Sequence, residues 1–393
     1  MLWTLGARQL KLKLKGEMMK KLNLSFVTAL ISMALAAGMV QAQEQQDGIN
    51  VAGTVRVNYA YKDYSESSKD KGGDFAFDMA AIKFNGKLGE WGLASEYRFY
   101  DGWQALRYGY GFYELNPEWQ LQFGVNQVPF GNPGFISNSF WFGVPYYLGF
   151  EDDYDLGIKA IYSSGAWGTE MAFYKNAEYG AGRSDRYSTD LYSGLVNGTE
   201  YHNEETNQLN LRQTYEINYE GGETRFGGSV EYGQIYNSKT GNNGDRYALA
   251  IHMDSNYQGW ALQLQVMQYE YDAADAIDNN KIAVAAYNWQ YEIASKAQAY
   301  SINLAKNIVT DWGSLKFYND FGMVTPDVAD KGYDTSYQNV TGCAISAGPT
   351  YTMIDFIMGK NMYASTRDNG HVGLPEMGDS WDKRVNINFG YYF

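Results

Sequence analysis

Arg98 and Arg107 are the charged residues whose placement is best suited to act on a solute. They flank the tight connection Asp101-Gly102-Trp103, so a simple hairpin register sets them opposite each other on adjacent strands. Like charges in this position repel each other unless an acid such as Glu96 or Glu114 neutralises them, or unless they splay into water. Alternatively, they form one wall of a narrow channel whose other wall is acidic, and the transverse field filters solutes by charge and dipole.

The segment 130–152 is the candidate for the opposite wall. It is long, and it is unusually apolar for a loop. Because such side chains do not stay in solvent, we expect the segment to fold inwards and narrow the channel; capping a rim or a neighbouring subunit is the alternative. The constriction residues expected in it and directly after it are Phe135, Phe140, Trp141, Tyr146, Tyr147, Glu151, Asp152 and Asp153.

The acidic run at the exit of this segment, Glu151-Asp152-Asp153-Tyr154-Asp155, has three interpretations. It is a solvated acidic rim, or it faces the two arginines, or it binds Ca²⁺ at the outer surface, since Ca²⁺ prefers carboxylate oxygens. A solvated rim is the plainest of these, because charged residues are mostly exposed. The sequence therefore predicts no defined metal site.

Other reactive groups are scarce. His202, His252 and His371 are the three histidines, no G-x-S-x-G motif occurs, and Cys343 stands alone. A nucleophile paired with its base is therefore not identifiable, and we expect neither an enzyme nor a cofactor. With 45 acidic against 31 basic residues, we expect no nucleic-acid partner, because binding to phosphates requires a basic surface.

Apolar and polar residues alternate from residue 51 to the end of the chain, as expected for strands with two different faces. In the last segment, the odd-numbered residues from Val385 to Phe393 are apolar and the even-numbered ones from Arg384 to Gly390 are polar or small. The alternating segments are about 10 to 14 residues long, enough to cross a bilayer when tilted. Short turns alternate with long loops near 63–73, 130–152, 177–205, 272–280, 325–335 and 364–381. This pattern predicts an all-β protein, a transmembrane antiparallel β-barrel with an inserted constriction loop.

We expect sixteen strands, with fourteen or eighteen as alternatives. Both chain ends are expected on the short-turn side, which requires an even number of strands. Dividing the sequence into alternating segments gives an odd number of strands, so we assign 281–291 to a long extracellular excursion. In the second strand the alternation slips near Ala80-Ala81, which predicts a β-bulge.

A barrel of this width is too wide for side chains to fill, so a polar interior predicts a water-filled channel for small hydrophilic solutes and ions. The residues expected to line it are Arg98, Arg107, Glu96, Arg56, Lys83, Asp155, Lys159, Arg212 and Arg225. A sugar channel with a track of aromatic side chains is one alternative. An adhesion barrel with a blocked lumen, acting through the loop at 177–205, is another.

The beginning of the chain carries a targeting signal. Met19-Lys20-Lys21 is a basic start, residues 22–40 are apolar, and Val40-Gln41-Ala42 fits a cleavage site, so we expect a secretory signal peptide at 19–42. A retained membrane helix is the alternative. Residues 1–18 are expected to be a mis-assigned start or leader, and 43–393 a single outer-membrane barrel domain.

Residues 119–162 resemble the phosphate-selective porin O/P family and its general-porin relatives. The matching residues are Phe123, Gly124, Pro129, Phe130 and Gly131, followed after a long loop by Asp155 and Gly157. Phe393 resembles the terminal aromatic residue by which the barrel-assembly machinery recognises outer-membrane proteins. The resemblance implies a 16-stranded barrel in the outer-membrane lipid, a homotrimer and a pore narrowed by inserted loops. Members with phosphate selectivity have a basic channel lining; because basic and acidic residues are mixed here, a general or mildly cation-tolerant porin is expected instead.

Overall fold

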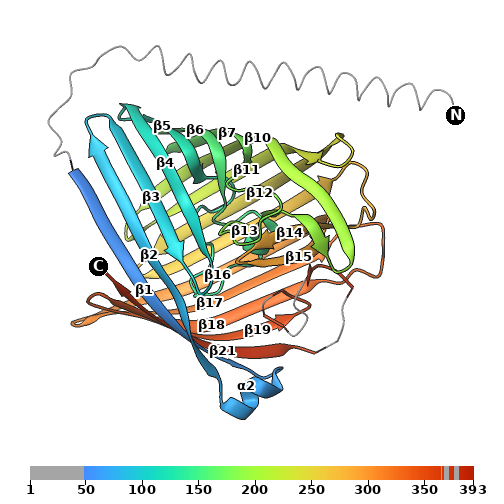
Figure 1. Ribbon diagram of the computed structural model, residues 1–393. Coiled ribbons are helices and arrows are strands. Elements are labelled where there is room, and N and C mark those ends of the chain that lie inside the picture. The colour runs from blue at the N-terminus through green and yellow to red at the C-terminus, as the bar shows by residue number, and fades with distance from the viewer. Residues whose placement is uncertain (1–47, 364, 367–370, 376–379) are drawn as a thin grey trace.

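The computed structural model describes residues 48–363, 365–366, 371–375 and 380–393 (Figure 1). The expected leader and signal peptide lie outside the described residues, as does part of the loop at 364–381. Within the described ranges, no helix combines the length and the apolar character needed to cross a bilayer.

Sixteen antiparallel strands form one closed barrel, as the sequence predicted. They are β1 (Gly48–Lys62), β2 (Asp74–Leu88), β3 (Trp91–Phe99), β4 (Gln104–Asn116), β5 (Trp119–Gln127), β6 (Tyr154–Ser164), β7 (Trp167–Ala177), β10 (Thr199–Tyr219), β11 (Gly222–Asn237), β12 (Asn243–Tyr257), β13 (Trp260–Asp272), β16 (Lys296–Thr310), β17 (Gly313–Pro326), β18 (Ser336–Ala347), β19 (Thr350–Lys360) and β21 (Asp382–Tyr392). The first strand pairs with the last, from Thr54↔Tyr392 to Lys62↔Arg384, which closes the cylinder. The short strand β9 (Ser193–Val196) extends the sheet beside β10.

The alternation along the strands separates two environments. Large apolar side chains such as Phe123, Ile251 and Phe389 are exposed on the outer face of the barrel, whereas the neighbouring Gln122 and Asn388 are buried. An exposed apolar band of this extent is what a strand presents to lipid, while the polar positions face the interior.

Register shifts interrupt the regular pairing at several places. Between β1 and β2 the register passes from Arg56↔Met79 to Val57↔Phe77, so Asp78 is the extra residue. The sequence placed this bulge near Ala80-Ala81, and the correct position is slightly upstream because alternation shows a slip only after the extra residue has displaced the next side chains. Another shift lies between β3 and β4, and the others lie between β4 and β5, β6 and β7, and β10 and β11.

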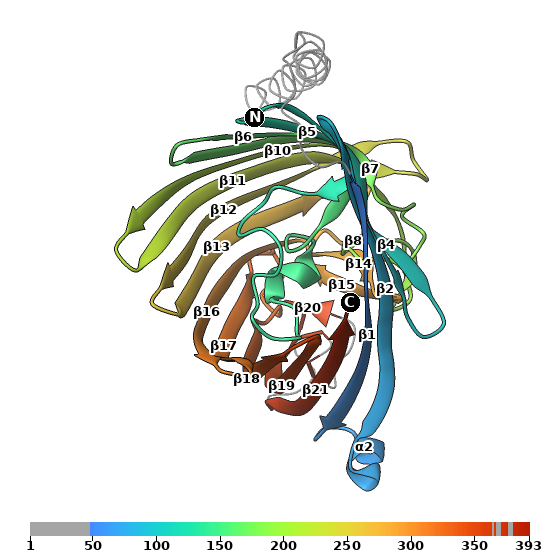
Figure 2. The ribbon, with the colours of Figure 1, turned by 90° about the vertical axis from the view of Figure 1, so that its left-hand side faces the viewer.

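A four-stranded sheet lies inside the barrel (Figure 2). Its strands are β8 (Asp190–Leu191), β14 (Lys281–Ala286), β15 (Trp289–Ala294) and β20 (His371–Val372). The hairpin of β14 and β15 contains the segment 281–291, which indeed does not join the barrel wall. Its side chains pack with buried wall alanines such as Ala248 and Ala299 in one apolar cluster, because small wall residues leave room for the sheet.

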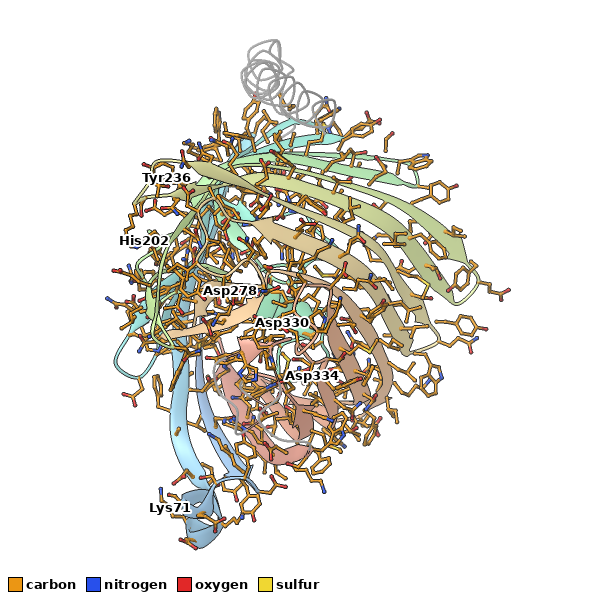
Figure 3. The ribbon with its side chains drawn as sticks, turned by 90° about the vertical axis from the view of Figure 1, so that its right-hand side faces the viewer. Lys71, His202, Tyr236, Asp278, Asp330 and Asp334 are labelled. Carbon is orange, nitrogen blue, oxygen red and sulfur yellow. The ribbon has the colours of Figure 1, made fainter. Side chains whose placement is uncertain are left out.

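The connections differ at the two ends of the barrel. At the short-turn end, neighbouring strands are joined by tight turns, for example Tyr257 to Trp260. At the long-loop end, α2 (Glu66–Lys71) joins β1 to β2, and the 3-10 helix η1 (Val144–Leu148) lies in the loop between β5 and β6. The side chains labelled in Figure 3 belong to the loops and strand ends of this side. This arrangement agrees with the predicted order of short and long connections.

Candidate functional site

The loop between β5 and β6, residues 128–153, crosses the inside of the barrel to the opposite wall (Figure 2). The backbone N–H groups of Asn138 and Ser139 donate to Oδ2 of Asp320 on β17 at 2.8 and 2.9 Å. The N–H of Phe140 donates to Asp355 on β19 at 3.2 Å. Carboxylates on the far wall thus accept the backbone donors that a loop in the lumen would otherwise leave unpaired. The predicted inward folding of this loop is confirmed.

Glu151 holds the loop in its compact form. Its Oε1 accepts hydrogen bonds from the N–H groups of Ile136 and Gly143, both at 3.2 Å, while Oε2 is buried and accepts none. Burial is the main cause that raises the pKa of this carboxyl to about 8. Phe142 stacks on Tyr146 with ring centroids 3.7 Å apart, so apolar packing and a neutral acid together stabilise the fold of the loop.

The two arginines singled out from the sequence do not face each other. The simple register is wrong, because Arg98 pairs with Ala105 and the bulge leaves Arg107 as the extra residue of β4. Both guanidinium groups instead contact Glu96: Nε of Arg98 lies 2.5 Å from Oε1, and Nη1 of Arg107 lies 3.2 Å from Oε2. Lys83 approaches the same carboxylate at 3.2 Å. The repulsion expected between the arginines is therefore offset by one shared, fully buried acid.

Asp152 is the acid that the loop brings to this cluster. Arg107 Nη2 lies 2.6 Å from its Oδ2, and the hydroxyl groups of Tyr154 and Tyr187 also donate to it. All of 151–155 is buried, so the interpretation of this run as a solvated rim is wrong. The alternative interpretation, in which the acidic run faces the arginines, is correct for Asp152.

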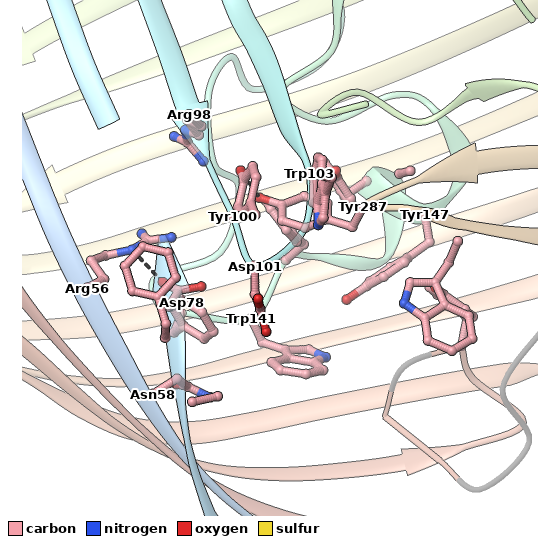
Figure 4. A pocket seen from close by; sticks show the side chains of 18 of the residues that line it. Arg56, Asn58, Asp78, Arg98, Tyr100, Asp101, Trp103, Trp141, Tyr147 and Tyr287 are labelled. Atoms are coloured by element: carbon pink, nitrogen blue, oxygen red, sulfur yellow. Dashed lines mark hydrogen bonds and ion pairs between the residues drawn. The ribbon is translucent and has the colours of Figure 1, made fainter. Parts of the chain in front are cut away.

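Two cavities lie on either side of the loop. One, of about 410 Å³, reaches the long-loop end, where Asp101 and Trp289 line it (Figure 4). The other, of about 470 Å³, reaches towards the short turns and is lined there by Asn256. Arg56, Phe135 and Phe140 line both cavities.

The shared lining has one charged group and two aromatic rings. Arg56 is paired with Asp78 at 2.6 Å, and its guanidinium lies 5.3 Å from the centroid of the Phe140 ring. Phe135 is half exposed, and the guanidinium of Arg107 lies 5.2 Å from its ring centroid. The narrow region is therefore bounded by the β1–β2 wall and by the aromatic side chains of the loop.

The remaining predicted wall residues lie on the inner side of the strands, away from the narrow region that the two cavities share. Lys159 donates to the carbonyl of Gln127 at 2.7 Å, and Arg212 donates to the carbonyl of Gly131 at 2.8 Å, so both bind the base of the loop. Arg225 pairs with Glu216 and, together with Arg212, lines a separate cavity of about 310 Å³. Asp155 is buried beneath the loop and lines neither of the two central cavities.

The aromatic wall of the cavity at the long-loop end was not found from the sequence. Tyr100 stacks on Trp103 with centroids 4.0 Å apart, and Tyr287, from the tip of the β14–β15 hairpin, meets both rings edge-on (Figure 4). Trp141 and Tyr147 of the loop were expected here and line the same cavity. The sequence around Tyr287 does not predict that it lines the cavity, because its position depends on how the β14–β15 hairpin packs inside the barrel.

Among the residues that the structure describes, Ser229 and His252 form the pair that most resembles a nucleophile and its base. Ser229 Oγ lies 3.4 Å from His252 Nε2, but both residues are buried under the loop. The other ring nitrogen faces Asn132 Oδ1 at 3.2 Å rather than a carboxylate, and Ser229 accepts the N–H of Gly131. The pair thus anchors the base of the loop.

No protein-family model matches the chain, and no curated protein matches it. Solved structures do resemble it. The outer membrane channel DcaP of Acinetobacter baumannii has 13% identity and a TM-score of 0.56, over 90% of this chain and 100% of that one. An anion-selective porin from Comamonas acidovorans has 11% identity and a TM-score of 0.54, over 88% and 100%. The chain has the fold of outer-membrane porins.

A third structure with this porin fold is the trimer form of OmpT, an outer membrane protein of Vibrio cholerae. It has 11% identity and a TM-score of 0.57, and the match covers 89% of this chain and 100% of that one. These likenesses agree with the general-porin part of the resemblance at 119–162. They do not single out its phosphate-selective members.

Proposed function

We propose that the chain is a porin of the bacterial outer membrane that forms a narrow, water-filled channel for passive diffusion of small hydrophilic solutes and ions. The observation that carries the proposal is the pair of cavities that reach opposite ends of the barrel and share Arg56, Phe135 and Phe140. A solute that passes between the two cavities must pass these three side chains. The exposed apolar outer face suits a barrel surrounded by lipid.

The channel is proposed to select mainly by size. The two cavities together are lined by the basic residues Arg56, Arg98, Lys316 and Arg384 and by the acidic residues Asp78, Asp101 and Asp254. This near balance, with Arg56 already paired to Asp78, favours a weak ion preference. We therefore propose a general porin and carry over neither phosphate nor anion selectivity from the resemblance or from the Comamonas porin.

We further propose that the protein assembles as a homotrimer and enters the membrane through the barrel-assembly machinery. The trimer form of the Vibrio OmpT structure supports the first part. The second rests on the terminal aromatic Phe393, whose backbone pairs with Gly53 of β1 through N–H···O bonds of 2.9 and 3.0 Å. Electrophoresis of the unheated protein, and insertion of a chain that lacks Phe393, test these two parts separately.

Single-channel recording in planar bilayers with asymmetric KCl tests the channel itself. The expected result is a stable conductance with a small reversal potential. A strong anion preference would contradict size-based passage and favour the phosphate-type reading. Complete absence of conductance from correctly folded protein would favour an adhesion barrel whose lumen is filled by the inner sheet.

A sugar channel is the second candidate, because stacked and edge-on aromatic rings line the opening at the long-loop end. Sugars stack on such rings and hydrogen-bond to flanking charged groups, here Arg56 and Asp78. Titration of the open channel with malto-oligosaccharides distinguishes this candidate. A block of ion current that the Trp103→Ala substitution removes would support it, and an unaffected current would exclude it.

A further inference from the structure

Three buried carboxyl groups meet where the loop, the barrel wall and the inner sheet touch. Asp153 is the last residue of the loop, Asp155 is the second residue of β6, and Asp190 is the first residue of β8. One oxygen from each lies within 4.8 Å of the other two. The side chains are nearly inaccessible, with exposures of 4%, 1% and 2% respectively.

The partners of these carboxyl groups within the described residues are incomplete. Oδ1 of Asp155 is buried and accepts no hydrogen bond. Asp153 accepts the N–H of Tyr154 through Oδ1 at 3.0 Å. Asp190 is the one of the three that is paired with a base, since Nη2 of Arg186 lies 2.7 Å from its Oδ2. A buried carboxylate oxygen without a donor is costly, so the site lacks a positively charged or donating group.

The surrounding side chains do not supply the missing positive charge. Arg186 is shared between Glu178 and Asp190, and Arg246 is shared between Glu205 and Glu231. With Asp153 and Asp155 added, two buried guanidinium groups face six carboxyl groups. Four carboxyl groups are then without a compensating charge, and they must bind either protons or another cation.

We propose that Asp153, Asp155 and Asp190 bind one Ca²⁺ ion. Ca²⁺ takes oxygen ligands at about 2.3 to 2.6 Å, so two ligand atoms of one ion lie within about 5 Å of each other, as the three carboxylate oxygens do. The ion supplies two positive charges and a ligand position for the unpartnered oxygen of Asp155. It also ties the exit of the loop to the wall and to the inner sheet, and thereby holds the constriction in place.

The ion competes with protons for the same oxygens. A carboxylate binds Ca²⁺ in its deprotonated form, so any proton that the cation-free site holds is released when the ion binds. Proton release therefore distinguishes binding at this buried site from weak binding of Ca²⁺ at surface carboxylates.

The test uses protein refolded into a synthetic detergent without lipopolysaccharide, treated with EDTA and then titrated with Ca²⁺. We expect one bound Ca²⁺ per chain by elemental analysis, proton release in weakly buffered solution, and a rise of several degrees in the midpoint of thermal unfolding. Absence of stoichiometric Ca²⁺ in the unmodified protein overturns the proposal without any variant.

The Asp153→Asn, Asp190→Asn double variant removes two ligands while keeping the shape of the protonated side chains. It should fold like the cation-free protein and lose the bound Ca²⁺, the proton release and the thermal shift. Asp311→Asn, in an exposed turn at the short-turn end, is the matched control and should keep all three. Retention of the Ca²⁺ response in the double variant, or its equal loss in the control, overturns the assignment.

Discussion

The guanidinium of Arg107 donates through Nη2 to both carboxylate oxygens of Asp152, at 2.9 and 2.6 Å. The contact joins β4 to the end of the loop that crosses the lumen, 45 residues further along the chain. Asp152 adopts the left-handed conformation, with φ of 50°, which directs the loop into the barrel wall. One ion pair therefore fixes the position of the loop relative to the short β3–β4 hairpin.

Asp152→Ala should loosen this attachment. The Asp152 side chain is fully buried, and loss of one partner leaves Arg107 with only a share of Glu96. We expect a loss of about 3 to 5 kcal/mol in the free energy of unfolding, and faster proteolysis within 128–153, both measured in detergent. Asp74→Ala removes an exposed pair with Lys71 and should cost about 0 to 1 kcal/mol. Equal effects of the two substitutions would contradict an anchoring role for Asp152.

Gly322→Val should displace the loop from the opposite wall. A Cβ atom at Gly322 would lie 2.7 Å from Cγ1 of Val144, at the start of η1. Overpacking of this kind costs about 1 to 3 kcal/mol, and the unfolding midpoint should fall accordingly. Gly228→Val is the control, since its nearest neighbour would be 3.8 Å away. Comparable destabilisation by both would mean that the loop does not pack on β17.

The stability of the folded loop should decrease as the pH rises through about 8. Glu151 keeps its proton up to a pKa of about 8 in the folded protein, whereas its unperturbed pKa is 4.5. The stabilisation is complete below about pH 4.5 and is lost as the folded carboxyl ionises, with an upper limit on the order of 5 kcal/mol.

Thermal unfolding of the parent and of Glu151→Gln between pH 5 and 9.5 measures this dependence. The glutamine keeps an oxygen for the N–H groups of Ile136 and Gly143 and cannot ionise. The difference between the two unfolding midpoints should therefore change with pH in favour of the variant above pH 8. A constant difference would show that Glu151 does not titrate in this range.

Phe140→Ala should raise the single-channel conductance. Phe140 lines both central cavities, so truncation of its ring widens the passage that ions share. Phe123→Ala removes the same ring from the outer face, where it is half exposed, and should leave the conductance unchanged. If Phe140→Ala behaves like Phe123→Ala, ions pass by another route.

The predicted filter made by Arg98 and Arg107 can be examined in the same recordings. Because the side chain of Arg98 is only 5% exposed and that of Arg56 is 16% exposed, we expect Arg56→Ala to shift the reversal potential more than Arg98→Ala does. Arg56 borders both cavities, whereas Arg98 borders only the one at the long-loop end. A larger shift with Arg98→Ala would restore the original hypothesis.

The amino-acid sequence alone determined the barrel. The alternation that places Phe389 outside and Asn388 inside is local, and so are the turn residues between strands, because each depends on residues one or two positions apart. The inward course of the loop also followed from composition, since a run of aromatic residues cannot remain in water.

Which charged groups contact each other depends on the folded barrel and not on the local sequence. The bulge leaves Arg107 without a directly paired residue on β3, so the register that would set it opposite Arg98 does not form. Ser139 and Asp320 are 181 residues apart, and Asp153 and Asp190 come from different elements, so no spacing in the sequence connects them. Closing a cylinder brings distant wall residues and loops together in one lumen, and the constriction and the proposed Ca²⁺ site are products of that closure.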